Sequence, residues 1–195
     1  EDPWLTSRLT VANIEGLQSG GVMANVKHYL ANNQETQRGS INEIIDDRTL
    51  HEIYMPGFKA AVQEAHVDSI MCAYPRVNGE FNCENEPLLN GVLRGEWGFK
   101  GFVMSDFGAT HSARASMLAG LDLELPGGHF YAALLQQAID NGTVPMTLVD
   151  RALVRRYATM IEAGLFNRKP LDRIQNNAIP VFANGAISRH IAEES

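Results

Sequence analysis

The sequence predicts an α/β fold in which strands and helices alternate around a parallel sheet. Short apolar runs recur along the chain, each bounded by glycine or polar residues as buried strands are, and helical patterns follow them. Strands that alternate with helices pair in parallel and are covered on both faces, which agrees with the nearly continuous apolar character of these runs. We expect about four strand–helix units before residue 165, a number that follows from the count of apolar runs.

The expected strands are residues 22–26, 69–74, 101–104 and 121–125, and the expected helices are residues 50–65, 87–97, 130–139 and 147–165. Pro56 should kink the first helix, because proline has no amide hydrogen to donate. Pro87 suits the first turn of the second helix. Thr147 and Asp150 have the spacing of a capping box at the start of the last one.

The chain divides into three parts by composition. Residues 1–165 carry the periodic pattern, and residues 166–186 are polar and proline-containing, as an inter-domain linker would be. Residues 187–195 have the pattern of the first turns of a helix, which we expect to open a following domain.

Composition excludes several classes of protein. Of the 195 residues, 45% are hydrophobic and 20% charged, which is typical of a globular chain and excludes disorder. The net charge of −7 and the scattered lysines and arginines predict neither a nucleic-acid partner nor a membrane partner. No apolar run approaches the roughly 18 residues of a membrane span. A first residue other than methionine agrees with removal of a targeting segment, so both secreted and cytoplasmic locations stay open, with secretion slightly favoured.

Cysteine and histidine give no sign of a metal site. Cys72 and Cys83 have no metal-ligand spacing and are expected as small, half-buried thiols, although a single bridge between them stays open. His51, His66 and His190 fall in helical patterns, where we expect ordinary surface or core histidines. No glycine-rich phosphate loop is present. We therefore predict no metal and no organic cofactor.

Polar residues at the ends of the predicted strands are the candidates for chemistry, because parallel β/α folds bind ligands at the carboxyl ends of their strands. These residues are Lys27 and His28, Tyr74, Ser105 and Asp106, and Glu124. Two carboxylates, a cation, an imidazole and a phenol suit glycoside or acyl hydrolysis better than hydride or phosphoryl transfer. Each could also be a loop cap. Asp106 stands out because it follows an uninterrupted apolar strand and precedes Phe107 and Gly108.

Six segments together resemble glycoside hydrolase family 3, of the β-glucosidase type. They are EDPWL (1–5), VKHYLANNQE (26–35) followed by Arg38, IMCAY (70–74) with VNG (77–79), LRGEWGF (93–99), GFVMSD (101–106) and AGLDLELP (119–126). The segments occur in order over nearly the whole chain, which makes the resemblance specific.

The resemblance implies the carboxyl-terminal half of a (β/α)₈ barrel, followed by the linker. It implies hydrolysis of terminal non-reducing β-D-glucosidic bonds by a retaining double displacement with Asp106 as nucleophile. Lys27, His28 and Arg38 match residues that hold the sugar hydroxyls in subsite −1, and Tyr74 matches the tyrosine beside the nucleophile. The partners it implies are a β-glycoside substrate and the remaining segments of the same polypeptide.

Groups outside this chain complete the expected site. An aspartate and an arginine of the first subsite belong to the upstream barrel half in the family pattern, and the general acid/base glutamate belongs to a following domain. Glu124 matches a framework residue. Half of a barrel has two open edges, where we expect inward-facing apolar side chains such as Val103 and Leu123 to be exposed.

Departures from the family pattern leave alternatives. Phe107 stands where the family has tryptophan, so the aglycone preference stays open. A β-xylosidase is possible. A β-N-acetylhexosaminidase is disfavoured, because residues 30–35 replace the Pro-Gly-His-Gly loop of that branch. A non-catalytic carbohydrate-binding barrel would not need Asp106, and a metal-dependent hydrolase lacks clustered ligands.

Overall fold

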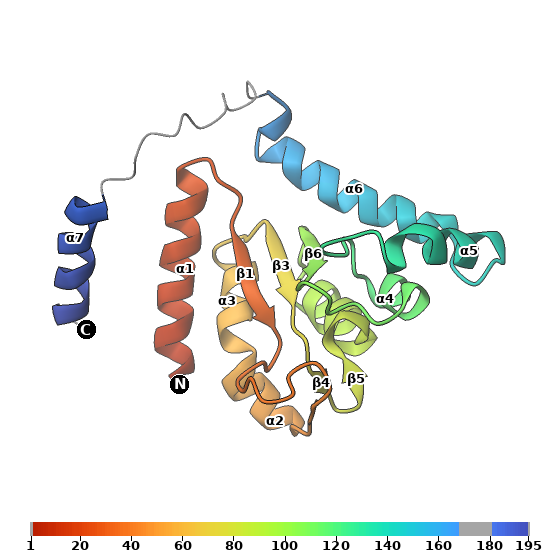
Figure 1. Ribbon diagram of the computed structural model, residues 1–195, viewed down its shortest axis with the longest axis horizontal. Coiled ribbons are helices and arrows are strands. Elements are labelled where there is room, and N and C mark those ends of the chain that lie inside the picture. Colours follow the sequence, from red (N-terminus) through yellow and green to blue (C-terminus); the bar gives the residue numbers. More distant parts are fainter. Residues whose placement is uncertain (1, 168–180, 195) are drawn as a thin grey trace.

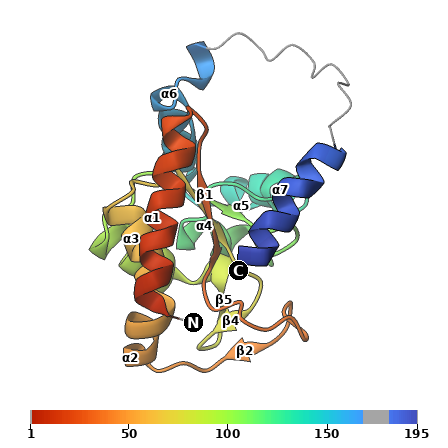
Figure 2. The ribbon, with the colours of Figure 1, turned by 90° about the vertical axis from the view of Figure 1, so that its left-hand side faces the viewer.

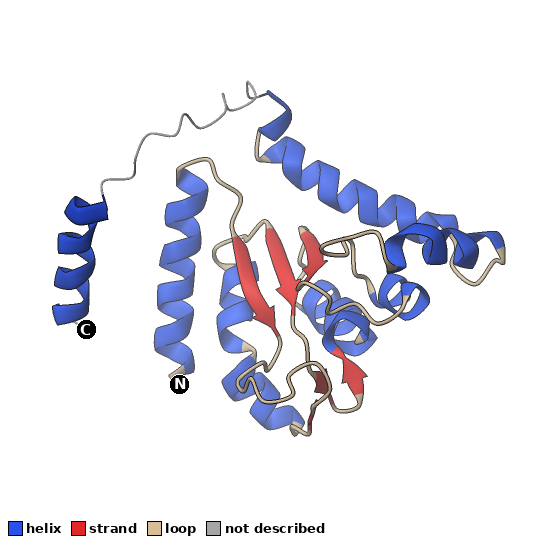
Figure 3. Ribbon diagram, in the orientation of Figure 1, coloured by secondary structure: helices blue, strands red, loops and turns tan. Residues whose placement is uncertain are grey.

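The computed structural model describes residues 2–167 and 181–194 and has a three-stranded parallel sheet at its centre. In spatial order the strands are β1 (Asn25–Tyr29), β3 (Ser69–Cys72) and β6 (Phe102–Ser105). They lie side by side and point the same way (Figure 3). Leu123 adds a single parallel bridge to Met104 beyond β6. The predicted α/β class with a parallel, half-barrel sheet is therefore confirmed.

Helices precede, separate and follow the strands along the chain. In the described residues they are α1 (Pro3–Ser19), α2 (Asp47–Thr49), η1 (Leu50–Tyr54), α3 (Pro56–Gln63), η2 (Asn82–Glu84), η3 (Pro87–Glu96), α4 (Ala113–Ala119), η4 (Phe130–Leu134), α5 (Leu135–Asp140), α6 (Met146–Glu162), η5 (Leu165–Asn167) and α7 (Val181–Glu194). The helix α1 runs antiparallel to β1 and packs on α3 (Figures 1 and 2).

Two helices form that the apolar patterns did not predict, and both have clear local signals. Asp2 caps α1 by accepting hydrogen bonds from the amides of Trp4 and Leu5, and Pro3 occupies the first turn. Ser112 caps α4 by accepting from the amide of Ala115. The helix α4 ends at Gly120, whose φ of 102° lies in the left-handed region that glycine adopts without strain.

The strand boundaries differ from prediction in ways that matter for the site. The first strand begins at Asn25 and ends at Tyr29, later than the expected 22–26, so Lys27 and His28 lie within the strand instead of after it. The expected strand at 121–125 is reduced to a single parallel bridge, between Leu123 and Met104.

The expected helices are found with corrections at their ends. The pattern over 50–65 is interrupted before Pro56, as predicted, and Pro87 begins η3. The capping box at Thr147 is wrong, because α6 begins one residue earlier and Pro145 precedes it without a side-chain cap. The helix expected over 130–139 is regular only from Leu135 onward.

A second small sheet lies at the carboxyl ends of the main strands (Figure 1). It consists of β2 (Asn42–Glu43), β4 (Arg76–Val77) and β5 (Glu80–Phe81), in the order β2-β4-β5. Asn78 and Gly79, both with positive φ, form the two-residue turn between β4 and β5, which is the usual asparagine–glycine hairpin turn. The side chain of Asn78 also exchanges two hydrogen bonds with the backbone of Ile45, which ties the hairpin to the segment after β2.

The two faces of the main sheet differ in burial. Lys27, Met71, Met104 and Leu123 pair across the sheet in one row, and all four are at least partly exposed. Val103 lies in the neighbouring row and is fully buried in the main apolar core. The expectation that Val103 is exposed at the open half-barrel is therefore wrong, because strand alternation turns it toward the helices.

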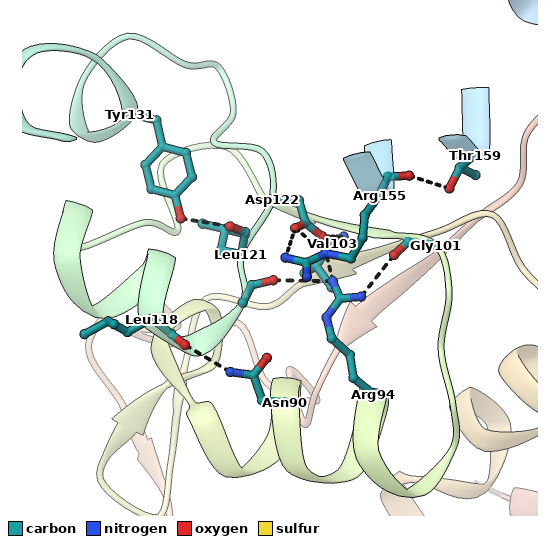
Figure 4. A network of polar contacts seen from close by, with 11 residues as sticks. Asn90, Arg94, Gly101, Val103, Leu118, Leu121, Asp122, Tyr131, Arg155 and Thr159 are labelled. Atoms are coloured by element: carbon teal, nitrogen blue, oxygen red, sulfur yellow. Dashed lines mark hydrogen bonds and ion pairs between the residues drawn. The ribbon is translucent and has the colours of Figure 1, made fainter. Parts of the chain in front are cut away.

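A buried ion-pair network ties α6 to the amino-terminal end of β6 (Figure 4). Asp122 accepts hydrogen bonds from the guanidinium groups of Arg94, at 2.6 Å, and Arg155, at 2.8 Å, and from the amide of Val103. The carboxylate of Asp122 is fully buried. Burial lowers the pKa of Arg94 to about 10, which still leaves its guanidinium charged at neutral pH.

Cys72 and Cys83 form a disulfide and are both fully buried. The expectation of two half-buried thiols is wrong, and the alternative of a single bridge is the one observed. The bond joins the end of β3 to η2, so it anchors the loop that contains Tyr74 and the β4–β5 hairpin.

Other expectations concern single residues and the end of the chain. His51 lies in η1, whereas His66 follows α3 with a φ of 50°, outside any helix. Residues 168–180 of the expected linker lie outside the described residues, and α7 begins at Val181, earlier than the helix expected from residue 187. No helix in the described part of the chain is both long and apolar enough to cross a lipid bilayer.

Candidate active site

The carboxyl ends of β1, β3 and β6 bring together the side chains of His28, Tyr74 and Asp106. Lys27 pairs with Met71 and Tyr29 with Cys72, so His28 is an extra residue in β1 opposite a continuous β3. Such a bulge changes the direction of the side chain it carries. Tyr29, next to it, is fully buried and donates its hydroxyl to the carbonyl of Leu88, which anchors the strand end.

Asp106 follows β6 directly, and its backbone and side chain are both held. Its amide donates to the carbonyl of Cys72 at 3.1 Å, which keeps the chain in line with the end of β3. Oδ1 accepts a hydrogen bond from the amide of Phe107 at 2.7 Å, and Oδ2 lies 3.1 Å from Nε2 of His28. The Asp106 side chain is only 17% exposed, so the carboxylate is oriented but still reachable from the open side.

The environment of His28 favours its neutral form. Burial lowers the pKa of His28 below its ordinary value, and the positive charges of Lys27 and Arg38 lower this pKa further, while the negative charge of Asp106 raises it. A neutral imidazole carries one N–H, and when that proton is on Nε2 it can point toward the carboxylate of Asp106 across the 3.1 Å contact.

Tyr74 and Arg38 form the other side of the site. The Tyr74 hydroxyl donates to the carbonyl of Phe107 at 2.9 Å. Burial, followed by the charge of Asp106, raises the pKa of Tyr74, so the phenol stays protonated at neutral pH. The guanidinium of Arg38 lies 4.4 Å from the centre of the Tyr74 ring and pairs with Glu35 at 2.6 Å. Arg38 therefore points its charge over the tyrosine at the rim of the site.

Lys27 belongs to a neighbouring cavity of about 380 Å³ beside β1, lined also by His28 and by residues of α1 and α3. Lys27 is exposed there, and Asn32 and Asn33 of the following loop line the same cavity. Asp106 does not line it. The structure thus groups four of the predicted site residues directly, and His28 connects that group to Lys27.

Glu124 is part of the framework. It is 5% exposed and accepts hydrogen bonds from the amides of Phe130 and Tyr131 through its two carboxylate oxygens. Ser105 is also structural, because its Oγ accepts from the amide of Leu125 at 2.8 Å. Both residues shape the segment that follows β6 and leave Asp106 as the accessible carboxylate among the predicted strand-end residues.

Glu35 received no role from sequence reasoning. It holds Arg38 from three positions earlier in the chain, a spacing at which opposite charges often pair. Phe107, expected to bear on aglycone preference, is 64% exposed directly beside Asp106, and its carbonyl receives the Tyr74 hydroxyl. The exposure of this ring and its contact with Tyr74 are shown only by the structure.

The chain is similar in sequence to proteins of one family. Residues 1–159 match the sequence model of the glycosyl hydrolase family 3 N terminal domain. Over the whole chain, 40% of positions are identical to thermostable beta-glucosidase B of Acetivibrio thermocellus and 41% to a beta-glucosidase of Rhizobium radiobacter. The chain spans about a quarter of the length of these relatives.

Solved structures agree with the sequence comparison. DesR, a beta-glucosidase from Streptomyces venezuelae in complex with D-glucose, superposes with a TM-score of 0.86 and 41% identity over 99% of this chain and 26% of that one. Beta-glucosidase 3B from Thermotoga neapolitana, in complex with alpha-D-glucose, superposes with a TM-score of 0.83 and 36% identity over 86% of this chain and 24% of that one. The described strands and helices, and the family match over residues 1–159, lead to one conclusion: the chain belongs to glycosyl hydrolase family 3.

Proposed function

We propose that this chain supplies the nucleophile and part of the sugar site of a retaining β-glucosidase. The observation that carries the proposal is the carboxylate of Asp106, oriented by His28 and the amide of Phe107 at the shared end of three parallel strands. The relatives named beta-glucosidase, and the neighbours solved with glucose, support glucose as the sugar.

The reaction proceeds in two displacements at the anomeric carbon. In the first, an oxygen of Asp106 forms a bond to that carbon while the bond to the aglycone oxygen breaks, and a general acid protonates the departing oxygen. In the second, the same group takes a proton from water, water attacks the anomeric carbon, and the bond to Asp106 breaks. The two inversions return the β configuration to the released glucose.

Contacts at both carboxylate oxygens restrain the nucleophile before the substrate arrives. Oδ1 of Asp106 accepts the amide of Phe107, and Oδ2 lies 3.1 Å from Nε2 of His28, which limits rotation of the carboxylate. An oriented nucleophile loses little freedom on reaching the transition state, and positioning of this kind supplies several kcal/mol of barrier reduction, roughly 7–11 in favourable cases. Neutral His28 performs this task without cancelling the charge of the nucleophile.

The cations bind the sugar. Arg38 at the rim and Lys27 in the neighbouring cavity are both exposed, and each can donate to ring hydroxyls. Hydrogen bonds from such donors stabilise the transition state if they become shorter as charge develops on the sugar ring. Phe107 offers an apolar ring face beside the reacting carbon, and we propose that it forms the wall against which the aglycone packs.

The general acid lies outside the described residues in this proposal. The supporting observation is the position of Glu124, whose carboxylate is buried and bonded to two backbone amides, so it cannot reach a glycosidic oxygen. A retaining enzyme needs its two carboxyl groups about 5–5.5 Å apart. The remaining segments of the same polypeptide would supply this second carboxyl group and complete the barrel.

Covalent labelling tests the proposal. The polypeptide that contains this chain together with the rest of the barrel is treated with 2,4-dinitrophenyl 2-deoxy-2-fluoro-β-D-glucoside, and its peptides are mapped by mass spectrometry. We expect one fluoroglucosyl group on the peptide that contains Asp106 and none in Asp106→Asn. Label on another carboxylate would remove Asp106 from the role. Binding of glucose without label or turnover would favour a non-catalytic carbohydrate-binding barrel, and faster turnover of an aryl β-xyloside or N-acetyl-β-glucosaminide would change the substrate.

A further inference from the structure

Asn82 lies below the site and connects the loops that carry its residues. It is the first residue of η2, and only 1% of its surface is exposed. Its Nδ2 donates to the carbonyl of Leu30 at 2.8 Å and to the carbonyl of Pro75 at 3.0 Å. Both partners can only accept, so the orientation of the amide is determined by the contacts themselves.

The two carbonyls belong to different strand ends of the candidate site. Leu30 follows β1 two residues after His28, and Pro75 follows β3 one residue after Tyr74. The backbone amide of Asn82 also donates to Pro75, at 3.1 Å. One side chain therefore sets the distance between the segment that presents His28 and the segment that presents Tyr74.

The third strand end is linked to the same turn through the disulfide. Cys83, next to Asn82, is bonded to Cys72, and the carbonyl of Cys72 accepts the amide of Asp106. The turn at residues 82–84 thus bonds directly to the ends of β1 and β3, and through Cys72 it is linked to the segment after β6, without touching the site itself. His28 and Asp106 lie on strands that are not neighbours in the sheet, so their 3.1 Å contact depends on how these ends are held relative to each other.

We propose that Asn82 is a positioning residue for the reaction: its amide holds the β1 and β3 ends in the register that places His28 on Asp106 and Tyr74 beside it. This inference rests on the proposed glycosidase function and adds a residue to it. Without the two donors, the carbonyls of Leu30 and Pro75 lose their common partner and the loops can separate. A displacement of about 1 Å in a catalytic group can lower the rate by 10²-fold.

The experiment compares two side-chain amides in the polypeptide that includes the rest of the barrel. Asn82→Ala removes the link between the strand ends. Asn90→Ala is the matched control, because the half-buried amide of Asn90 donates to the carbonyl of Leu118 in α4 and not to a strand end of the site. Both variants are assayed for thermal unfolding and for kcat and KM on an aryl β-glucoside, well below their melting temperatures.

We expect both variants to lose melting temperature and only Asn82→Ala to lose catalysis. Its kcat should fall about 10–100-fold, a range set by the cost of small misplacements, with a smaller change in KM. Asn90→Ala should keep kcat within about twofold, because its lost bond to Leu118 joins no segment that carries a site residue. Parental kcat in Asn82→Ala, or equal losses of kcat in both variants, would overturn the positioning role.

A second Asn82 variant and the parent protein complete the experiment. If Asn82→Ala does not fold, Asn82→Ser is used, because the shorter serine side chain has a single donor and cannot reach both carbonyls. A kcat equal to that of the parent in Asn82→Ser would also overturn the proposal. The parent protein is measured alongside. A parent without glucosidase turnover refutes the proposed function, whereas an active parent with unaffected Asn82 variants refutes only the role of Asn82.

Discussion

His28 and Asp106 meet across the end of a strand to which neither belongs. Nε2 of His28, on β1, lies 3.1 Å from Oδ2 of Asp106, which follows β6, and β3 runs between these two strands. The contact therefore depends on the bulge at His28 and on the loops beyond all three strand ends.

Replacement of the proposed nucleophile should remove turnover while the fold persists. Asp106→Asn is expected to lower kcat by at least about 10³-fold, which corresponds to roughly 4 kcal/mol of transition-state stabilisation. Steady-state kinetics on an aryl β-glucoside measure the loss, and circular dichroism checks the fold. Asp140→Asn, at an exposed position of α5, is the control and should keep full activity. Substantial turnover by Asp106→Asn would exclude the nucleophile assignment.

The exposed cations should affect kinetics and leave stability nearly unchanged. Lys27→Met and Arg38→Gln are each expected to lower kcat/KM by about 10-fold or more, because each removes a charged donor to the sugar. Their melting temperatures should stay within a few degrees of the parent, since exposed ion pairs such as that of Arg38 with Glu35 contribute only about 0–1 kcal/mol. Arg48→Gln, which breaks a similar surface pair with Glu52, is the control for both. A loss of stability with unchanged kinetics would mean that these residues are structural.

Acidification should destabilise the protein partly through His28. The pKa of His28 in the folded state lies below its ordinary value of 6.5, so between these two values the unfolded chain binds more protons than the folded protein. The free energy of unfolding therefore falls as the pH decreases through this window. At pH values above the window the contribution of His28 to stability is fully present. Melting temperatures at pH 7.5 and pH 5 measure the effect. His28→Gln should lose less on acidification than the parent, and an equal loss would show that His28 titrates normally.

Loss of the buried carboxylate of Asp122 should lower the free energy of unfolding and leave kcat unchanged. Asp122→Ala leaves the guanidinium groups of Arg94 and Arg155 without their carboxylate partner in a largely buried position, which we expect to cost about 3–5 kcal/mol of unfolding free energy. Chemical denaturation measures this change. The network lies at the amino-terminal end of β6, away from Asp106, so kcat of the folded fraction should match the parent. A change below about 1 kcal/mol, the value of a surface pair, would contradict the role of the network.

Residues 1–195 expressed alone should associate and should not turn over β-glucosides. The apolar side chains of Trp4, Leu9, Val154 and Ile161 are each more than half exposed on α1 and α6, and β1 is an open edge of the described sheet. Light scattering after gel filtration measures the mass. Trp4→Glu combined with Leu9→Glu should reduce association if α1 contributes to it. A cooperatively unfolding monomer with the turnover of a whole enzyme would show that these surfaces need no partner and that the general acid lies within this chain.

Local sequence signals were sufficient for two strands of the sheet and for the position of Asp106. Apolar runs predicted the regions of β3 and β6, because a largely buried strand needs such a run wherever it occurs. The position of Asp106 follows from the end of its run, and the family motifs predicted the glycosyl hydrolase fold, which the comparisons confirm. Its role as nucleophile stays a prediction, as do the roles of Lys27, His28, Arg38 and Tyr74 and the division of the chain into domains.

Only the tertiary structure decided which of these residues meet. The bulge at His28 depends on pairing with β3, and the disulfide of Cys72 depends on where η2 packs. Asp122 gains its two arginines, and Asn82 its two carbonyls, from segments distant in the chain. The periodicity of apolar residues indicates whether a residue is buried, because that depends on its neighbours in the sequence. These contacts instead join residues far apart in the sequence, and the packing of whole helices and strands sets the distance between them. The sequence therefore determined which chemical groups end each strand, and the packing of the strand ends determined their distances and partners.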